Sequence, residues 1–166
     1  RTLAVVALHG LVLEAVAGAA ASTALGAAAL DHEARLDPVE REVVVEALAG
    51  EGDEVVLSIL EHHSNIVPWH FHRERKGAVI KWAPIDDEGN FLIDEYAKLL
   101  GPRTKMVAIT MMSNALGTIT PIQDIIRLAH DKGIPVLVDA SQMAVHGAVD
   151  VQALDADFLV FTGHKT

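Results

Sequence analysis

The stretch that decides the fold is IPVLVDASQMAVHGAVDVQALDADFLVFTGHK, residues 134–165. It contains two short apolar runs, at 134–138 and 157–161, and each has the length and β-branched content of a buried strand. Asp139 ends the first run, and Lys165 follows the second after three small or polar residues. In an open parallel sheet, ligands bind beyond the carboxyl ends of the strands. Two neighbouring strands could therefore deliver this acid and this lysine to one ligand.

An acid that faces a ring nitrogen and a lysine that can form a Schiff base are the two requirements of a pyridoxal 5'-phosphate (PLP) site. Each residue also has a plainer interpretation. Lys165 could be a solvated lysine, and Asp139 could cap a helix or make a structural hydrogen bond. Asp139 could also bind a metal with His146 and His164, although this spacing matches no recognised metal motif. We therefore expect no metal site.

From residue 54 onward, apolar runs of strand length alternate with segments that carry helix start and stop signals. This alternation predicts an α/β fold, with a mostly parallel sheet and helices on both faces. The predicted strands are 54–60, 78–83, 105–110, 134–138 and 157–161, and the predicted helices are 65–75, 93–100 and 121–132.

Residues 1–50 differ from the rest, because the first 30 residues hold eleven Ala and Glu14 is the only charge from Leu11 to Leu30. We expect an Ala-rich helical segment here, and a poorly ordered or membrane-related segment is the alternative. A helix over 38–49 is also predicted, with Asp37 at its N-cap. The predicted division is thus a segment 1–50 and a domain 51–166.

The composition limits the classes of function. The 166 residues are 51% apolar, which is enough for one domain with a core. The net charge is −10 with no basic cluster beyond residues 73–76, so we expect no nucleic-acid partner. The absence of Cys excludes disulfides, thiolate metal sites and a Cys nucleophile within the chain.

Two further loops follow predicted strands. Residues 61–65 read EHHSN, where one His could stack on a planar cofactor or simply belong to a capped turn. Residues 113–118 read SNALGT, where Asn114 could donate to a ring oxygen and Gly117 would permit a close approach of the backbone. The plain alternative for this second segment is an ordinary loop.

Taken in order, the motifs EHHSN, SNALGT, VDASQ and TGHK closely resemble the group II (Suf-type) cysteine desulfurases, which are related to selenocysteine lyases. These enzymes belong to the class V aminotransferase group of the fold-type I PLP enzymes. The resemblance runs from about residue 51 to residue 165. It implies that the chain holds part of the large PLP-binding domain of such an enzyme.

The resemblance also implies roles for individual residues. Lys165 would bind the cofactor covalently and later move the substrate α-proton, and His62 would stack on the ring as a second catalytic residue. The other cofactor-binding residues would be Asp139 at the pyridine nitrogen, Gln142 at the ring oxygen, Asn114 near that oxygen or the substrate carboxylate, and Thr162 and His164 at the phosphate.

The implied reaction converts L-cysteine, or L-selenocysteine, to L-alanine and passes sulfur to an acceptor protein. The implied setting is a cytoplasmic homodimer without a membrane partner. The chain departs from the family pattern at residues 32–38, which read HEARLDP and lack a Gly-Thr-Thr-Glu turn, and it has no Cys. For these residues alone we expect at most weak PLP binding and no desulfurase turnover. The alternatives are a class V aminotransferase or epimerase relative and a non-catalytic fragment or scaffold.

Overall fold

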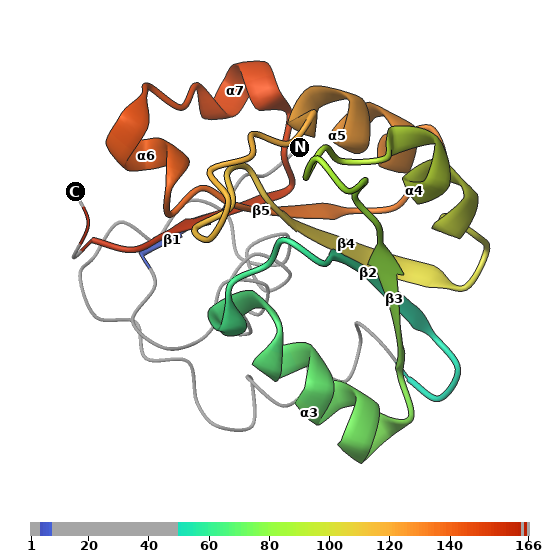
Figure 1. The fold of residues 1–166 in the computed structure, drawn as a ribbon. Helices are drawn as coiled ribbons and strands as arrows, with labels where there is room; N and C mark the ends of the chain where they lie inside the picture. Colours follow the sequence, from blue (N-terminus) through green and yellow to red (C-terminus); the bar gives the residue numbers. More distant parts are fainter. Residues whose placement is uncertain (1–3, 8–49, 164, 166) are drawn as a thin grey trace.

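The computed structural model describes residues 4–7, 50–163 and 165. They form a six-stranded sheet with the order β1-β6-β5-β4-β2-β3, in which each strand runs parallel to its neighbours (Figure 1). The parallel α/β architecture predicted from the sequence is therefore confirmed. The strands are β1 (Ala4–Ala7), β2 (Glu54–Ser58), β3 (Val79–Ala83), β4 (Thr104–Thr110), β5 (Val136–Asp139) and β6 (Phe158–Phe161).

Helices cover both faces of the sheet. Helix α3 lies on one face, and α4, α5 and α7 lie on the other (Figure 1). Each face has its own apolar core, with Trp69 of α3 fully buried in one and Tyr96 of α4 fully buried in the other. The helices are α3 (Val67–Lys76), α4 (Ile93–Leu99), α5 (Ile122–His130), α6 (Met143–His146) and α7 (Val151–Leu154), with a 3-10 turn η1 (His63–Asn65) before α3.

The burial of the inner strands explains why their sequences are almost continuously apolar. Every residue of β2 and β5 is buried, and so is every residue of β4 except Lys105. A parallel strand that is covered on both faces has no solvent side, so it shows no alternation of apolar and polar residues. Strand β5 pairs with β6, and Asp139 lies opposite Val160 in that ladder. The two strands of the 134–165 stretch are thus direct neighbours.

The segment after β2 differs from the prediction. The predicted strand 54–60 ends at Ser58, whose hydroxyl accepts the Leu60 N–H at 3.1 Å. A serine side chain that binds a nearby backbone N–H competes with the sheet ladder. The predicted helix 65–75 is divided in the structure into the η1 turn and α3.

The connection between β5 and β6 contains two helices, α6 and α7, which the sequence did not predict. Each has four residues, too few for an apolar period to be visible. Helix α7 has an ordinary start signal, because Asp150 Oδ1 accepts the N–H groups of Gln152 and Ala153, both at 3.0 Å.

The prediction of an Ala-rich helix is wrong for residues 4–7. They form strand β1, which pairs in parallel with β6 at one edge of the sheet. Two consecutive Val residues favour a strand, and β6 offers an edge to which they can pair. The rest of residues 1–49, including the predicted helix 38–49, lies outside the described residues, so the division at residue 50 stays a prediction. Within the described part of the chain, no helix has the length and apolar character to cross a membrane.

Candidate functional site

Four neighbouring strands, in the order β6-β5-β4-β2, end at the same edge of the sheet because they run parallel. The described site residues predicted from the sequence lie at these strand ends or in the loops that follow them. His62 follows β2, Asn114 follows β4, Asp139 ends β5 with Gln142 just after it, and Thr162 and Lys165 follow β6. Position in the fold therefore brings together residues that are up to a hundred positions apart in the chain.

Asp139 is the last residue of β5, and its exposed fraction is only 2%. Its Oδ1 atom accepts the N–H of Ser141 at 2.9 Å, and its backbone oxygen accepts the N–H of Met111 at 2.9 Å. A buried carboxylate is costly unless it has partners that favour its charge. Asp139 thus occupies the place and burial expected of an acid that faces a cationic ligand group.

Lys165 lies just beyond β6 and is half-buried, and its backbone N–H donates to the oxygen of Thr162 at 3.5 Å. Thr162 is itself buried, with an exposed fraction of 7%. His164 lies outside the described residues. The chain therefore turns directly after β6 and keeps Lys165 at the carboxyl edge of the sheet.

His62 is exposed and caps the η1 turn. Its Nδ1 atom accepts the N–H of Ser64 at 3.2 Å and lies 2.9 Å from the Ser64 hydroxyl. The capped turn considered from the sequence is thus present, and it fixes the ring through Nδ1. The ring of His63 is 6.0 Å away and inclined by 61°, so the two rings point in different directions.

Asn114 lies at the exposed tip of a tight loop. Ser113 closes this loop, because its N–H donates to Thr118 at 2.9 Å and its oxygen accepts the Gly117 N–H at 3.0 Å. Gly117 has φ +73°, a conformation that favours glycine, and nothing but a methionine methyl at 4.0 Å lies near its absent side chain. Turn geometry, rather than close approach of the backbone, is what Gly117 provides here.

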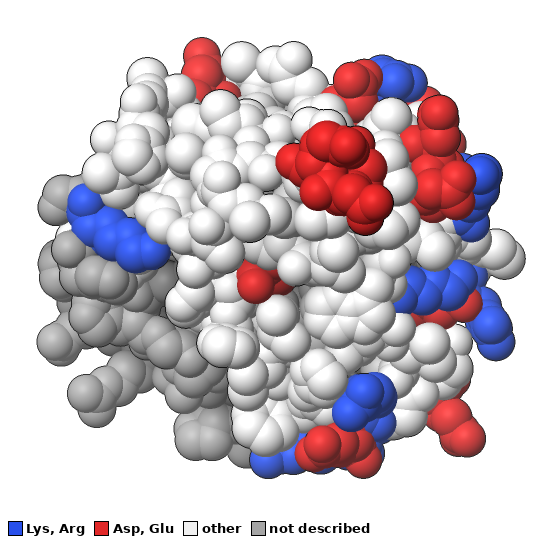
Figure 2. All heavy atoms as spheres, viewed as in Figure 1, with Lys and Arg blue, Asp and Glu red and all other residues white. Residues whose placement is uncertain are grey.

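A pocket of about 280 Å³ lies between the loops that follow β2 and β4. His62 and Asn114 both line it, so the structure brings these two predicted residues together. Asp139, the half-buried Gln142, Thr162 and Lys165 do not line this pocket. In the view of Figure 2, the middle of the surface carries few charged side chains, and most Lys and Arg lie toward its rim.

Glu61 is a buried acid to which the sequence analysis assigned no role. Its exposed fraction is 8%, although it lies between β2 and the exposed His62. Burial, with the negative charge of Asp139 in addition, raises the pKa of Glu61 to about 7, against the lowering effect of three hydrogen bonds. A sequence signal existed, since Glu61 directly follows an apolar strand within the EHHSN motif.

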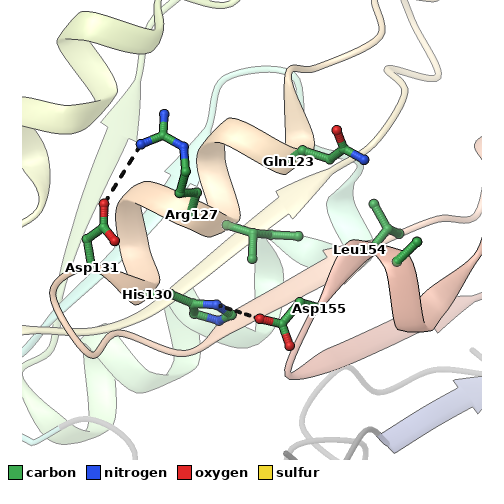
Figure 3. Close-up of a pocket in the computed structure, with 8 residues that line it drawn as sticks. Gln123, Arg127, His130, Asp131, Leu154 and Asp155 are labelled. Carbon is green, nitrogen blue, oxygen red and sulfur yellow. Dashed lines mark ion pairs between the residues drawn. The ribbon is translucent and has the colours of Figure 1, made fainter.

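A second pocket, of about 430 Å³, lies between α5 and α7 and contains none of the predicted residues. Figure 3 shows His130 directed at Asp155 across this pocket, with Nδ1 and Oδ2 3.5 Å apart. His130 also bonds Asp157 at 2.8 Å through Nε2, and Asp157 accepts the Val136 N–H at 2.8 Å. These contacts join α5 to the starts of β5 and β6, at the edge opposite the predicted site. Among the described residues, no group of three or more His, Asp or Glu side chains is arranged to hold a metal ion.

The sequence of this chain is similar to those of known proteins. Over 115 residues the chain is 56% identical to a cysteine desulfurase of Synechococcus elongatus, an alignment that covers 69% of this chain and 18% of that protein. A probable cysteine desulfurase of Mycolicibacterium paratuberculosis is 54% identical over 114 residues, covering 69% of this chain and 17% of that protein. The chain thus spans about a fifth of the length of these relatives.

Solved structures show the same fold. The cysteine desulfurase CsdA of Escherichia coli, in its S-sulfonic acid form, matches with a TM-score of 0.67 at 28% identity, covering 92% of this chain and 48% of that one. A variant of C-DES with glycine covalently linked to its PLP cofactor matches with a TM-score of 0.63 at 27% identity, covering 69% of this chain and 31% of that one. Residues 41–166 match the family described as Aminotransferase class-V. With three quarters of its length inside that match and the same parallel sheet, the chain belongs to the class-V aminotransferase family.

Proposed function

We propose that this chain is the cofactor-binding part of a PLP-dependent cysteine desulfurase, which converts L-cysteine to L-alanine and passes sulfur to an acceptor protein. The observation that carries the proposal is the pairing of β5 with β6, which sends Asp139 and Lys165 to the same edge of the sheet. The 56% identity to a cysteine desulfurase over 115 residues supports the assignment of L-cysteine as the substrate. The C-DES structure with glycine linked to PLP supports the cofactor.

The groups present fit PLP. Asp139 is a nearly inaccessible acid with one oxygen on the Ser141 amide, and a protonated pyridine nitrogen is a cation that would offset the cost of burying its charge. Lys165 is a half-buried amine beside Gly163, whose missing side chain leaves room for a ligand. Bound PLP supplies an electron sink for the negative charge that develops at the substrate α-carbon.

The chain's own side chains would then act as follows. Asp139 would keep the ring nitrogen protonated, and Lys165 would hold the aldehyde carbon and later take the substrate α-proton. His62, fixed through Nδ1 by Ser64, would present its ring face to the cofactor. The remaining contacts would come from Gln142 and Asn114 at the ring oxygen and from Thr162 and His164 at the phosphate.

The wider setting belongs to the same proposal. The substrate is L-cysteine or L-selenocysteine, the product sulfur goes to an acceptor protein, and the protein works as a homodimer in the cytoplasm. The chain has no Cys, so the thiol that first accepts sulfur does not lie within these 166 residues.

Covalent labelling tests the cofactor assignment. The chain is incubated with PLP, reduced with borohydride and digested, and the labelled peptides are mapped. We expect the label on Lys165, and we expect Asp139→Asn to reduce it at limiting PLP while keeping the acceptor for Ser141. Lys132→Arg is the matched control, because Lys132 is engaged with the oxygen of Leu100 at 2.7 Å and lies outside the site. Label spread evenly over the lysines, or unaffected by Asp139→Asn, contradicts the proposal.

A second candidate is a class V aminotransferase or epimerase, which needs no thiol and is favoured by the absence of Cys. In a full-length protein that contains this chain, the products distinguish the two reactions on L-cysteine. A desulfurase releases L-alanine, whereas an aminotransferase releases a keto acid and an epimerase inverts the α-carbon. A chain that takes no label at Lys165 leaves only the non-catalytic scaffold.

A further inference from the structure

Glu61 is a buried acid within the site edge that the proposed function does not use. It lies between the end of β2 and the exposed His62, with an exposed fraction of 8%. Its carboxyl group is reached by donors from three places. Ser58 Oγ and the Thr110 N–H lie 2.5 Å and 3.0 Å from Oε1, and Asn65 Nδ2 lies 2.7 Å from Oε2.

Two of these groups can only donate a hydrogen bond to Glu61 and cannot accept one from it. The Thr110 N–H is a backbone group and can only donate. The Asn65 amide is oriented by Trp69, whose indole N–H donates to Asn65 Oδ1 at 3.4 Å. Because an indole nitrogen is only a donor, Oδ1 must face Trp69 and Nδ2 must face Glu61. Oε2 of Glu61 is therefore an acceptor.

Of these three partners, only Ser58 can either donate a hydrogen bond to Glu61 or accept one from it. A hydroxyl both donates and accepts, and Ser58 Oγ already accepts the Leu60 N–H at 3.1 Å. A proton on Glu61 consequently fits at one place, on Oε1 and directed at Ser58 Oγ. In the ionised state the same contact is made with Ser58 as the donor.

Asp139 lies next to this carboxyl group across β4. Thr110, which donates to Glu61, is paired with Asp139 in the β4–β5 ladder, and the Thr110 hydroxyl lies 3.4 Å from the backbone carbonyl oxygen of Asp139. Burial and the charge of Asp139 are the effects that disfavour ionisation of Glu61. Of the elements packed against Glu61, β4 contributes the uncharged Thr110 and η1 the uncharged Asn65, while His62 and His63 beside it are exposed.

We propose that Glu61 is a positioning residue whose carboxyl proton, held on Oε1 and donated to Ser58 Oγ, keeps its side chain neutral in the folded chain. In this neutral form it ties the segment before His62 to the end of β4 without placing a second negative charge beside Asp139. The site's negative charge then lies on Asp139 alone, where a cationic ring nitrogen needs it. This inference rests on the proposed function, because it concerns the acid that would face that nitrogen.

A pH titration of the cofactor-free chain tests the proposal. Glu is labelled with ¹³C at Cδ and Asp at Cγ, and the carboxyl resonances are followed by NMR from about pH 4 to about pH 9. We expect one Glu resonance with a midpoint of about 7, where an ordinary Glu has about 4.3. We also expect a smaller step in the Asp139 resonance at the same midpoint. If every Glu titrates near the ordinary value, Glu61 is ionised at neutral pH and the proposal fails.

Variants assign the signals and test the donation of this proton to Ser58. Glu61→Gln should remove both features, and Asp86→Asn, at an exposed Asp that binds the Asn90 N–H at 2.7 Å, should leave them unchanged. Gln at position 61 places an N–H against either Thr110 or Asn65, so that variant could fail to fold. Ser58→Ala keeps Glu61 and should move its midpoint by at least about half a unit. An unmoved midpoint overturns the donation to Ser58.

The titration and the labelling of Lys165 fail independently. The titration contains no PLP, so an absent label leaves its result unaffected. A Glu61 with an ordinary midpoint likewise leaves the labelling of Lys165 to stand or fall by itself.

Discussion

Both ring nitrogens of His72 are buried, with no hydrogen-bond partner among the described residues. The side chain is on α3, its exposed fraction is 3%, and its ring lies 5.8 Å from that of Trp69. A buried polar group without a partner loses its hydration and gains nothing in exchange, at a cost of about 1–3 kcal/mol. His72 is therefore a residue at which the native sequence is not optimal for stability.

Replacing His72 by Leu should increase the free energy of unfolding by about 1 kcal/mol at neutral pH. Burial, followed by the charges of Lys76 and Arg75, lowers the pKa of His72. As the pH falls below about 6.5, the unfolded chain takes up a proton at this position and the folded chain does not, so wild-type stability decreases. The advantage of His72→Leu should thus grow toward low pH.

Urea unfolding at two pH values, one on each side of the ordinary histidine pKa, measures this difference. His146→Gln is the control, because it replaces an exposed histidine on α6 instead of the buried histidine on α3. A His72→Leu variant that is less stable than wild type at both pH values contradicts the prediction.

At the scale of the element, the segment 50–77 shows how a short sequence fixes one strand and one helix. Gly77 ends α3 with φ +73°, and its N–H donates to the Arg73 oxygen at 3.2 Å. Its oxygen accepts the Gly52 N–H at 3.0 Å, which joins the end of α3 to the turn before β2. One glycine thus closes the helix and connects it to the sheet.

Gly77→Ala should destabilise the chain by about 1 kcal/mol or more. The left-handed conformation is unfavourable for alanine, and the added Cβ would lie 3.2 Å from Cγ of Glu51. The matched control is Gly147→Ala at the end of α6, where φ is −168° and no atom of the described residues lies within 4 Å of the added Cβ. Thermal unfolding of the two variants side by side provides the measurement, and equal midpoints would contradict the account of Gly77.

At the scale of the whole molecule, the chain contains the strand ends that would hold a cofactor and contains no thiol. With PLP and L-cysteine we expect no protein-bound sulfur on this chain, because a persulfide requires a cysteine side chain. Cyanolysis of the protein after gel filtration measures bound sulfur, and an amino-acid assay measures alanine. Repeated release of alanine by the chain alone would contradict the expected lack of turnover.

The positions of strands and helix ends along the chain could be predicted from the sequence where single residues carry strong local signals. The runs that became β4 and β5 are apolar enough to predict burial on both faces, and Gly77 and Gly133 mark the ends of helices. The acid of the predicted site directly follows such a run and the lysine comes four residues after another, so their positions near strand ends could be read without a structure. The expected helical segment is wrong over residues 4–7 because the two Val residues there favour a strand, and β6 provides the edge with which that strand pairs.

The sequence by itself determined the parallel α/β class and the order of the polar motifs along the chain, because apolar periodicity and turn residues act over short distances. Only the tertiary structure decided which strands are neighbours, and with that the meeting of Asp139 and Lys165 at one edge. It also decided that Glu61 is buried under donors from Ser58, Asn65 and Thr110. Contacts across 49 residues, such as that from Thr110 to Glu61, depend on strand register, and register is set by the packing of the whole sheet.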